Sequence, residues 1–115
     1  MSKFISGLLL KRIVEKYNID LIHANSEAAG IVAVKTRNKY KLDIPIVYTA
    51  HGVLPAKVKD IMNQVDKIIA VSEFSRKSAI KEGFLAEKIQ VIYNGVDTDK
   101  FKPNRQNKKF ITKKI

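Results

Sequence analysis

Residues 46–52 read Ile-Val-Tyr-Thr-Ala-His-Gly, and residues 91–97 read Val-Ile-Tyr-Asn-Gly-Val-Asp. Each stretch is an apolar run that stops abruptly on small or polar residues. A buried strand that presents polar groups at its carboxyl end is how open α/β sheets form binding crevices. We therefore expect both stretches to be strands whose ends contribute to a binding site. The candidate residues at these ends are Thr49, His51, Gly52, Asn94, Gly95 and Asp97.

The rest of the chain alternates between helical and strand patterns. Helical spacing or cap signals predict helices over residues 4–17, 27–40, 55–65 and 73–82. Ser26 is expected to cap the second of these helices, whose small residues Ala28, Ala29 and Gly30 let it lie close to the sheet. Gly83 is expected to follow the last helix as its C′ residue. Short apolar runs predict strands at residues 20–24, 44–48, 67–71 and 89–93. Strands separated by such helices cannot form hairpins and pair in parallel through right-handed crossovers. The sequence thus predicts an α/β fold, a Rossmann-like parallel sheet flanked by helices that forms half of a doubly wound domain.

Length and composition limit the chain to one domain. It has 115 residues, of which 45% are hydrophobic, and it contains no cysteine for a disulfide or thiolate chemistry. No apolar run approaches the roughly 18 residues needed to span a bilayer, and the first residues do not read as a signal peptide. We divide the chain into a domain over residues 1–103 and a basic tail over residues 104–115. Both outer strands would be apolar edges, so we expect further structure before Met1.

The charge is strongly positive. Lys and Arg number 22 against 11 Asp and Glu, a net charge of +11. Such a surface favours an anionic membrane face, phosphorylated small molecules or nucleic acid, and the alternative is a solvated, lysine-rich surface. Nucleic acid is the least favoured partner because the aromatic residues do not interleave with the basic ones as in a stacking platform.

Three other side chains are candidates, each with a plainer alternative. His23 lies within the strand at 20–24 and is either a crevice-edge or a core histidine, just as His51 could be a surface histidine. Ser72 is expected to cap the helix at 73–82, and Ser75 lies in its first turn, where free N–H groups could bind an anion. Residues 94–97 could form a tight turn or a hinge. We expect no metal, because zinc needs three or more ligands and none have suitable spacing.

Four motifs in order carry a family resemblance. They are Asp-Leu-Ile-His-Ala-Asn-Ser at 20–26, Pro-Ile-Val-Tyr-Thr-Ala-His-Gly at 45–52, Asp-Lys-Ile-Ile-Ala-Val-Ser at 66–72 and Val-Ile-Tyr-Asn-Gly-Val-Asp at 91–97. Together they resemble the retaining glycosyltransferases of family 4, and more narrowly the second half of their N-terminal domain. The resemblance implies a GT-B fold, in which the N-terminal domain binds the acceptor and the C-terminal domain binds a nucleotide sugar.

The resemblance also implies roles. The residue matching His51 lies in the cleft near the transferred sugar, and the helix led by Ser72 and Ser75 faces the cleft. The turn at 94–97 precedes the crossing to the second domain. The implied substrates are a nucleotide-sugar donor and a glycan, lipid-linked or small-molecule acceptor, with no cofactor. The implied location is the cytoplasm, with the inner face of the membrane as a peripheral site.

The chain departs from the family pattern in what it lacks. The family's first strands, its glycine-rich loop and the donor-binding domain with its E-x₇-E glutamates have no counterpart here, since no Glu is followed by another eight positions later. We therefore expect no transferase activity from the chain alone. The alternatives to a shortened transferase are a non-catalytic binding or regulatory module, or half of a split transferase whose partner chain carries the donor-binding domain.

Overall fold

A four-stranded parallel sheet organises the protein. The structure, a computed structural model, describes residues 3–103. Its strands pair in the order β1-β2-β3-β4, which confirms the predicted Rossmann-like parallel sheet. The elements in chain order are α1 (Lys3–Lys16), β1 (Ile22–Ala24), α2 (Glu27–Tyr40), β2 (Ile46–Ala50), α3 (Lys59–Met62), β3 (Lys67–Ala70), α4 (Glu73–Lys81) and β4 (Ile89–Val91).

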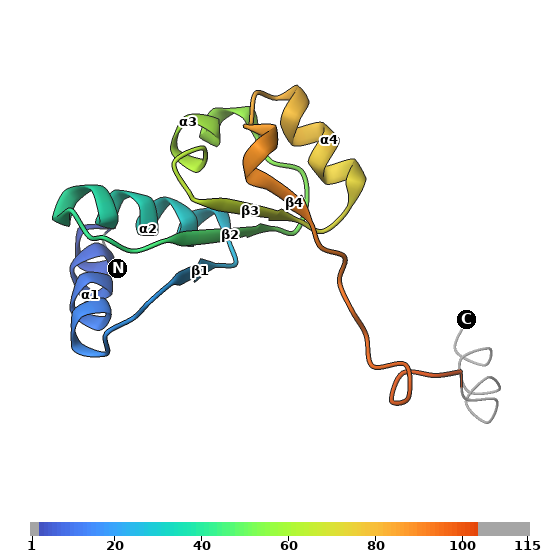
Figure 1. The fold of residues 1–115 in the computed structure, drawn as a ribbon, viewed down its shortest axis with the longest axis horizontal. Coiled ribbons are helices and arrows are strands. Elements are labelled where there is room, and N and C mark those ends of the chain that lie inside the picture. The colour runs from blue at the N-terminus through green and yellow to red at the C-terminus, as the bar shows by residue number, and fades with distance from the viewer. Residues whose placement is uncertain (1–2, 104–115) are drawn as a thin grey trace, which may run out of the picture.

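The helices that connect successive strands cover one side of this sheet. Figure 1 shows α2, α3 and α4 on the same side, while α1 packs beside α2 near the N-terminus. Each right-handed crossover steps in the same direction along the sheet, and this places all three connecting helices on one face. Within residues 3–103 the strand order never reverses, and β1 and β4 are the edge strands. The apolar stretches 44–47 and 68–71, which were expected to lie exposed at the edges, lie instead in or beside the inner strands β2 and β3. The sheet therefore has the one-sided arrangement of half a doubly wound domain.

The core lies between the sheet and these helices. Where α2 packs on the core, a Cβ at Gly30 would lie 2.7 Å from Met62 Cε, so the end of the flexible Met62 side chain would have to shift. Small residues were predicted to bring this helix close to the sheet, but Ala28 and Ala29 are exposed and only Gly30 is buried. The largest fully buried side chains are Ile46, Met62, Ile68, Val34 and Val65.

Several predicted boundaries shift in the structure. The helix predicted over 55–65 is wrong in extent, because a 3-10 turn at Ala56–Val58 precedes the single α turn of α3. Pro55 is extended at the cap and offers no side-chain hydrogen bond to the first turn, so the segment lacks a strong helix start. β2 runs to Ala50, which puts Thr49 inside the strand and not after it. The predicted basic tail, residues 104–115, lies outside the described residues.

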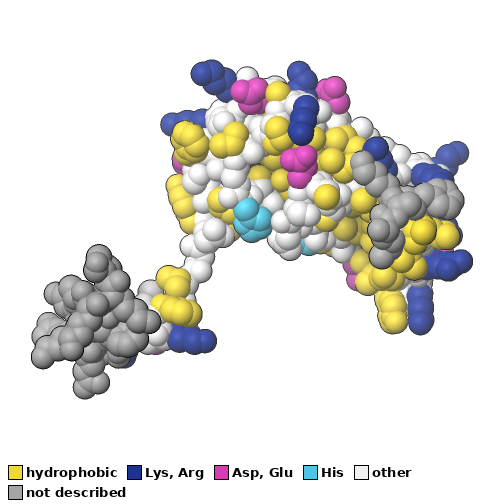
Figure 2. All heavy atoms as spheres, turned by 180° about the vertical axis from the view of Figure 1, so that it is seen from behind, with side chains coloured by type: hydrophobic (Ala, Val, Ile, Leu, Met, Phe, Trp, Pro, Cys, Tyr) yellow, Lys and Arg dark blue, Asp and Glu magenta, His cyan; other side chains and the backbone are white. Residues whose placement is uncertain are grey.

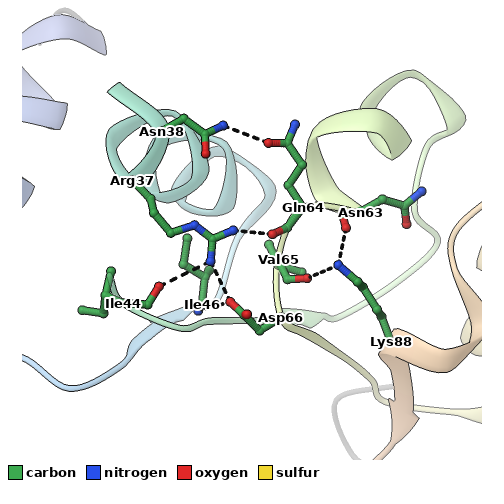
Figure 3. A network of polar contacts seen from close by, with 9 residues as sticks. All are labelled: Arg37, Asn38, Ile44, Ile46, Asn63, Gln64, Val65, Asp66 and Lys88. Atoms are coloured by element: carbon green, nitrogen blue, oxygen red, sulfur yellow. Dashed lines mark hydrogen bonds and ion pairs between the residues drawn. The ribbon is translucent and has the colours of Figure 1, made fainter. Parts of the chain in front are cut away.

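A polar network joins the elements at the amino-terminal edge of the sheet (Figure 3). Arg37 Nη1 of α2 donates to Asp66 Oδ2 at 2.7 Å and to the Ile44 carbonyl at 3.3 Å, and Arg37 Nη2 donates to the Gln64 carbonyl. Asp66 Oδ2 also accepts from the backbone N–H of Ile46 at 2.8 Å. These contacts fix the starts of β2 and β3 at the edge away from their carboxyl ends.

A second group of contacts extends this network to β4. Lys88 Nζ donates to the carbonyls of Asn63 at 2.6 Å and Val65 at 3.0 Å. Lys88 directly precedes β4, so this amine anchors the last strand to the loop before β3. The hydrogen bonds at the amino-terminal edge therefore hold the starts of the strands together. The carboxyl edge of the sheet lies on the opposite side from these contacts.

Gly83 ends α4 in a conformation that favours glycine. It follows the helix as predicted, with φ of 96°, and an added Cβ would lie 3.2 Å from Lys59 Cδ. We expect Gly83→Ala to lower the free energy of unfolding by about 1 kcal/mol because an alanine is strained at positive φ. Urea unfolding followed by circular dichroism measures the change. The control is Gly95→Ala, whose Cβ would meet nothing within 4 Å; equal losses in both variants would contradict the prediction.

Candidate functional site at the carboxyl edge of the sheet

The carboxyl ends of the strands place several predicted residues on one edge. His51 and Gly52 directly follow β2, and Ser72 follows β3 after a single intervening residue. Because Ala50 pairs with Ala70 in parallel register, the chain delivers His51 and Ser72 to neighbouring positions on this edge. The structure therefore brings the ends of the second and third motifs together.

The segment after β2 is open to solvent. His51 and Gly52 are both exposed, and an added Cβ at Gly52 would meet no atom within 4 Å. A histidine here can donate or accept a hydrogen bond, depending on its tautomer. The edge can therefore present an imidazole to a ligand with no obstruction from its own backbone.

Ser72 caps α4 as predicted. Its Oγ accepts from the Ser75 backbone N–H at 3.1 Å, and Ser72 Oγ donates to Ser75 Oγ at 3.0 Å. Ser75 is buried, so its hydroxyl orients the cap and is not open to solvent. The same edge carries a second serine cap, where Ser26 Oγ accepts from the Ala29 N–H of α2 at 3.2 Å. Two helix amino termini, with their positive dipole ends, therefore face this edge.

His23 and Thr49 contact each other directly. His23 Nε2 lies 2.8 Å from Thr49 Oγ1, and Thr49 is buried while His23 is exposed. In the parallel register, His23 pairs with Val47, so Thr49 is two residues farther along the same face of the sheet. Their hydrogen bond holds the imidazole across β1 and β2. This satisfies the Thr49 hydroxyl and orients the His23 ring.

A groove of about 370 Å³ runs beside His23 at the free edge of β1. Its walls are mostly small and apolar, and His23 is the polar side chain among them. The lining residues are Leu10, Ile22, His23, Ala24, Ala28, Ala29, Val32 and Ala33. The groove can hold an apolar group, with the imidazole as its polar contact.

Residues 94–97 do not join this edge. Of the two alternatives for residues 94–97, the tight turn does not form there: residues 92–97 have no regular secondary structure, and the turn comes at 98–100. Ile92 N–H still donates to the Ala70 carbonyl at 3.0 Å, and beyond it the chain leaves the sheet (Figure 1). Asp97 Oδ1 instead accepts from the N–H groups of Asp99 and Lys100, both at 3.0 Å. The exposed Asn94 and Gly95 lie on the departing segment.

One tyrosine of β2, the strand that ends at this edge, has a shifted pKa. Burial, with the charge of Glu27 as a second cause, raises the pKa of Tyr48.

Between Lys3 and Pro103 no cluster of three or more His, Asp or Glu side chains could hold a metal ion. In the same range no helix is long and apolar enough to cross a membrane.

The sequence reasoning missed two features of the site. The groove beside β1 was not foreseen. Its only signal in the sequence is the pair of small residues, Ala28 and Ala29, at the start of α2. Ser26 was recognised as a cap but not placed with Ser72, since only the common strand direction brings the two helix starts to one edge.

Solved glycosyltransferase structures have the same fold. The crystal structure of Anabaena HepE in complex with UDP-glucose matches with a TM-score of 0.75 and 26% identity, over 93% of this chain and 32% of that one. A glycosyltransferase from Rickettsia africae matches with a TM-score of 0.70 and 23% identity, over 97% of this chain and 32% of that one. The chain thus spans about a third of the solved proteins it resembles. A search of curated proteins finds no match.

The sequence of the chain also matches a protein-family model. The model of Glycosyltransferase Family 4 matches residues 3–100, which is nearly all of the described chain. The match includes the four strands and the carboxyl edge that carries His51 and Ser72. The chain belongs to Glycosyltransferase Family 4.

Proposed function

We propose that this chain forms the acceptor-side wall of a retaining glycosyltransferase, as the second half of the N-terminal domain of a GT-B enzyme. The complete enzyme would transfer a sugar from a nucleotide donor to a glycan, lipid-linked or small-molecule acceptor. The observation that carries the proposal is the carboxyl edge, where His51 and two serine-capped helix starts meet in a chain of this family. Anabaena HepE, a structural neighbour, has been solved with UDP and with UDP-glucose.

His51 is the residue proposed to act closest to the transferred sugar. Its exposed ring at the end of β2 could hydrogen-bond a sugar hydroxyl or a phosphate oxygen across the cleft. Ser72 and Gly52 would border the same cleft, while Ser75 would hold the Ser72 cap in place. Asn94, Gly95 and Asp97 would lie on the route to the second domain.

His23 and Thr49 are proposed to form the acceptor contact. The hydrogen bond to Thr49 fixes the His23 ring at the mouth of the apolar groove. A ring held in this way orients a ligand hydroxyl with little loss of side-chain entropy. An acceptor with an apolar portion would suit the groove.

The second candidate function is a binding or regulatory module, or one half of a split transferase. In the split form, a partner chain would supply the donor-binding domain. In both cases we expect no metal or cofactor, a cytoplasmic location and a peripheral position at the inner membrane face.

The chain alone is expected to be inactive. Donor positioning and phosphate stabilisation require a second wall across the cleft, and these effects supply most of the rate enhancement in transfer reactions. Purified chain incubated with radiolabelled UDP-glucose should release no glucose and form no glycoside. Turnover above a buffer control would contradict this arrangement.

A chimera tests the role of His51. The segment of Anabaena HepE that matches this chain is replaced by residues 3–100, and release of UDP from UDP-glucose is measured. In an active chimera, we expect His51→Ala to reduce turnover roughly a hundredfold to a thousandfold, the range for losing a hydrogen-bonding group that acts in the transition state. Gln90→Ala, an exposed change within β4, is the control. Unchanged turnover in His51→Ala would remove His51 from the site.

A further inference from the structure

The segment that follows β4 contains an asparagine directly followed by a glycine. Asn94 and Gly95 are both exposed and have no regular secondary structure. Of the seven asparagines in the sequence, Asn94 is the only one whose next residue is glycine. Figures 1 and 2 view the molecule from opposite sides, and in both the chain beyond β4 leaves the body of the protein. The pair is therefore open to water.

The reactive groups of this pair are not held by hydrogen bonds. Within residues 3–103 neither the Asn94 carboxamide nor the Gly95 N–H has a hydrogen-bond partner. The sheet makes its last backbone bond at Ile92, which donates to the Ala70 carbonyl at 3.0 Å, and the next bonded group along the chain is the Asp97 carboxylate. Between these two points no hydrogen bond of the described chain fixes the backbone.

Glycine at position 95 removes the usual steric barrier to attack by its own nitrogen. Because it has no Cβ, the backbone around it reaches conformations that other residues rarely adopt. An added Cβ would meet no atom within 4 Å, so the rest of the described fold does not restrict Gly95 either. The Gly95 nitrogen can therefore approach Asn94 Cγ and close a five-membered ring.

We propose that Asn94 is a site of spontaneous deamidation. The Gly95 nitrogen gives its proton to water or hydroxide and forms a bond to Asn94 Cγ. The bond from Cγ to the side-chain nitrogen then breaks, and this nitrogen takes up a proton and leaves as ammonia. The resulting succinimide adds one water molecule and opens at either carbonyl, which gives aspartate or isoaspartate. The reaction consumes water, releases ammonia and needs no oxidant or reductant.

The other described asparagines lack this combination of features. The Asn63 carboxamide is held by two backbone groups of the segment after α4, at 3.2 and 3.0 Å. Asn38 lies inside α2, where the helical hydrogen bonds fix the N–H of the next residue. Asn18 precedes isoleucine and Asn25 precedes serine, so a side chain restricts the attacking nitrogen in both cases. Asn94 should therefore react before them.

Each product changes the segment between the sheet and Asp97. Both add a carboxylate, which lowers the formal net charge of +11 by one. Isoaspartate also inserts one extra carbon into the backbone and so displaces the chain that follows. In the proposed enzyme this segment would lead to the second domain, and the modification would alter that crossing. The deamidation itself does not depend on the acceptor-wall role.

Ageing of the full 115-residue chain tests the proposal. Purified chain is kept warm in mildly alkaline buffer, and tryptic peptides are analysed by mass spectrometry over time. Peptide 89–100 contains Asn94 as its only asparagine. We expect fragments of this peptide to show that Asn94 exchanges NH₂ for OH, and an isoaspartyl methyltransferase to label the same peptide. Ion exchange should separate a product with one positive charge fewer.

The peptides that carry Asn25 and Asn63 are internal references in the same sample. We expect both to keep their mass over the period in which peptide 89–100 converts. If Asn94 keeps its amide for as long as Asn25 and Asn63 do, the proposal fails. Loss of transferase activity is not a readout here, so an inactive chimera in the His51 experiment would leave this result unaffected.

Substitutions at the pair test the reaction itself. Asn94→Gln should abolish conversion at this position because attack on its longer side chain would require a larger ring. Gly95→Ala should slow conversion strongly, since a Cβ restricts the attacking nitrogen. The matched control is Val96→Ala, which changes the next exposed residue and leaves both reacting groups in place. Equal rates in Gly95→Ala and the parent chain would overturn the proposed attack.

A second asparagine–glycine pair separates the effect of structure from that of sequence. Lys39→Gly places a glycine after Asn38 inside α2. We expect this pair to remain unmodified in the folded chain and to convert once urea unfolds it, and circular dichroism verifies the helix. If Asn38 converts as fast as Asn94 in the folded variant, the open segment after β4 does not set the rate, and the structural basis of the proposal is wrong.

Discussion

Replacing Ile68 with alanine is expected to lower the free energy of unfolding by about 2 to 5 kcal/mol. Ile68 is fully buried in β3, an inner strand with β2 on one side and β4 on the other. Truncation removes buried methyl and methylene groups and leaves a cavity that the surrounding strands cannot fully close. Since small domains are stable by only about 5 to 15 kcal/mol, the variant should lose a large part of its stability.

Urea unfolding followed by far-UV circular dichroism measures this loss. The matched control is Ile92→Ala, which deletes the same groups from an isoleucine that is 49% exposed. We expect the control to change stability by less than about 1 kcal/mol, because little apolar surface returns to water. A loss of similar size in both variants would show that Ile68 does not lie in the core.

Replacing Asp66 with asparagine is expected to lower stability at neutral pH by about 1 to 2 kcal/mol. The Asp66 carboxylate accepts from the Ile46 N–H and from Arg37 Nη1, and asparagine keeps the shape but loses the charge. Hydrogen bonds to charged groups contribute about 1.5 to 3 kcal/mol, and solvent screening reduces this value because the Asp66 side chain is 51% exposed. Thermal or urea unfolding at matched pH values measures the difference.

The effect of this substitution should depend on pH in a defined direction. Burial opposes ionisation of Asp66, but the hydrogen bonds from Ile46 and Arg37, with the charges of Arg37 and Lys88, outweigh it and lower the pKa of Asp66 below its ordinary value of 3.8. The unfolded chain therefore takes up the proton at a higher pH than the folded chain does. The stabilisation is complete well above 3.8 and is lost as the pH falls towards the lowered pKa.

Parent and Asp66→Asn chains should therefore differ most near neutral pH and converge below pH 3.8 as Asp66 becomes protonated. The control is Asp60→Asn, at an exposed position in α3. We expect this control to show no comparable change with pH. A constant difference between parent and Asp66→Asn at every pH would mean that charge is not what Asp66 contributes.

Local signals predicted most of the secondary structure. Ser26 and Ser72 both cap helices, and Gly83 follows α4 at positive φ, because each depends on a hydrogen bond or a backbone angle within a few residues. The helix predicted after Pro55 was wrong in extent because the local signals there are weak. Its apolar spacing suits a helix, but it has no side-chain cap, and the carbonyls of Asn63 and Val65 bond instead to the distant Lys88.

The candidate site was only partly predictable. His51 and Ser72 were identified because polar residues follow apolar strands, and parallel pairing was enough to place them on one edge. Asn94, Gly95 and Asp97 share the same pattern, yet they leave the sheet once the last backbone bond, from Ile92 to Ala70, is made. A strand end in the sequence does not reveal how far the neighbouring strand continues to pair with it.

By itself the sequence determined the order of helices and strands, their parallel pairing and the family, since these depend on periodicity, caps and motifs that lie close together along the chain. Tertiary structure alone decided which side chains meet. The His23–Thr49 hydrogen bond joins residues 26 positions apart, and the Arg37–Asp66 pair joins residues 29 apart. The first contact depends on strand register, whereas the Arg37–Asp66 pair and the apolar groove beside β1 depend on how the helices pack against the sheet. Register is set by the packing of the whole sheet against its helices, which no local pattern encodes.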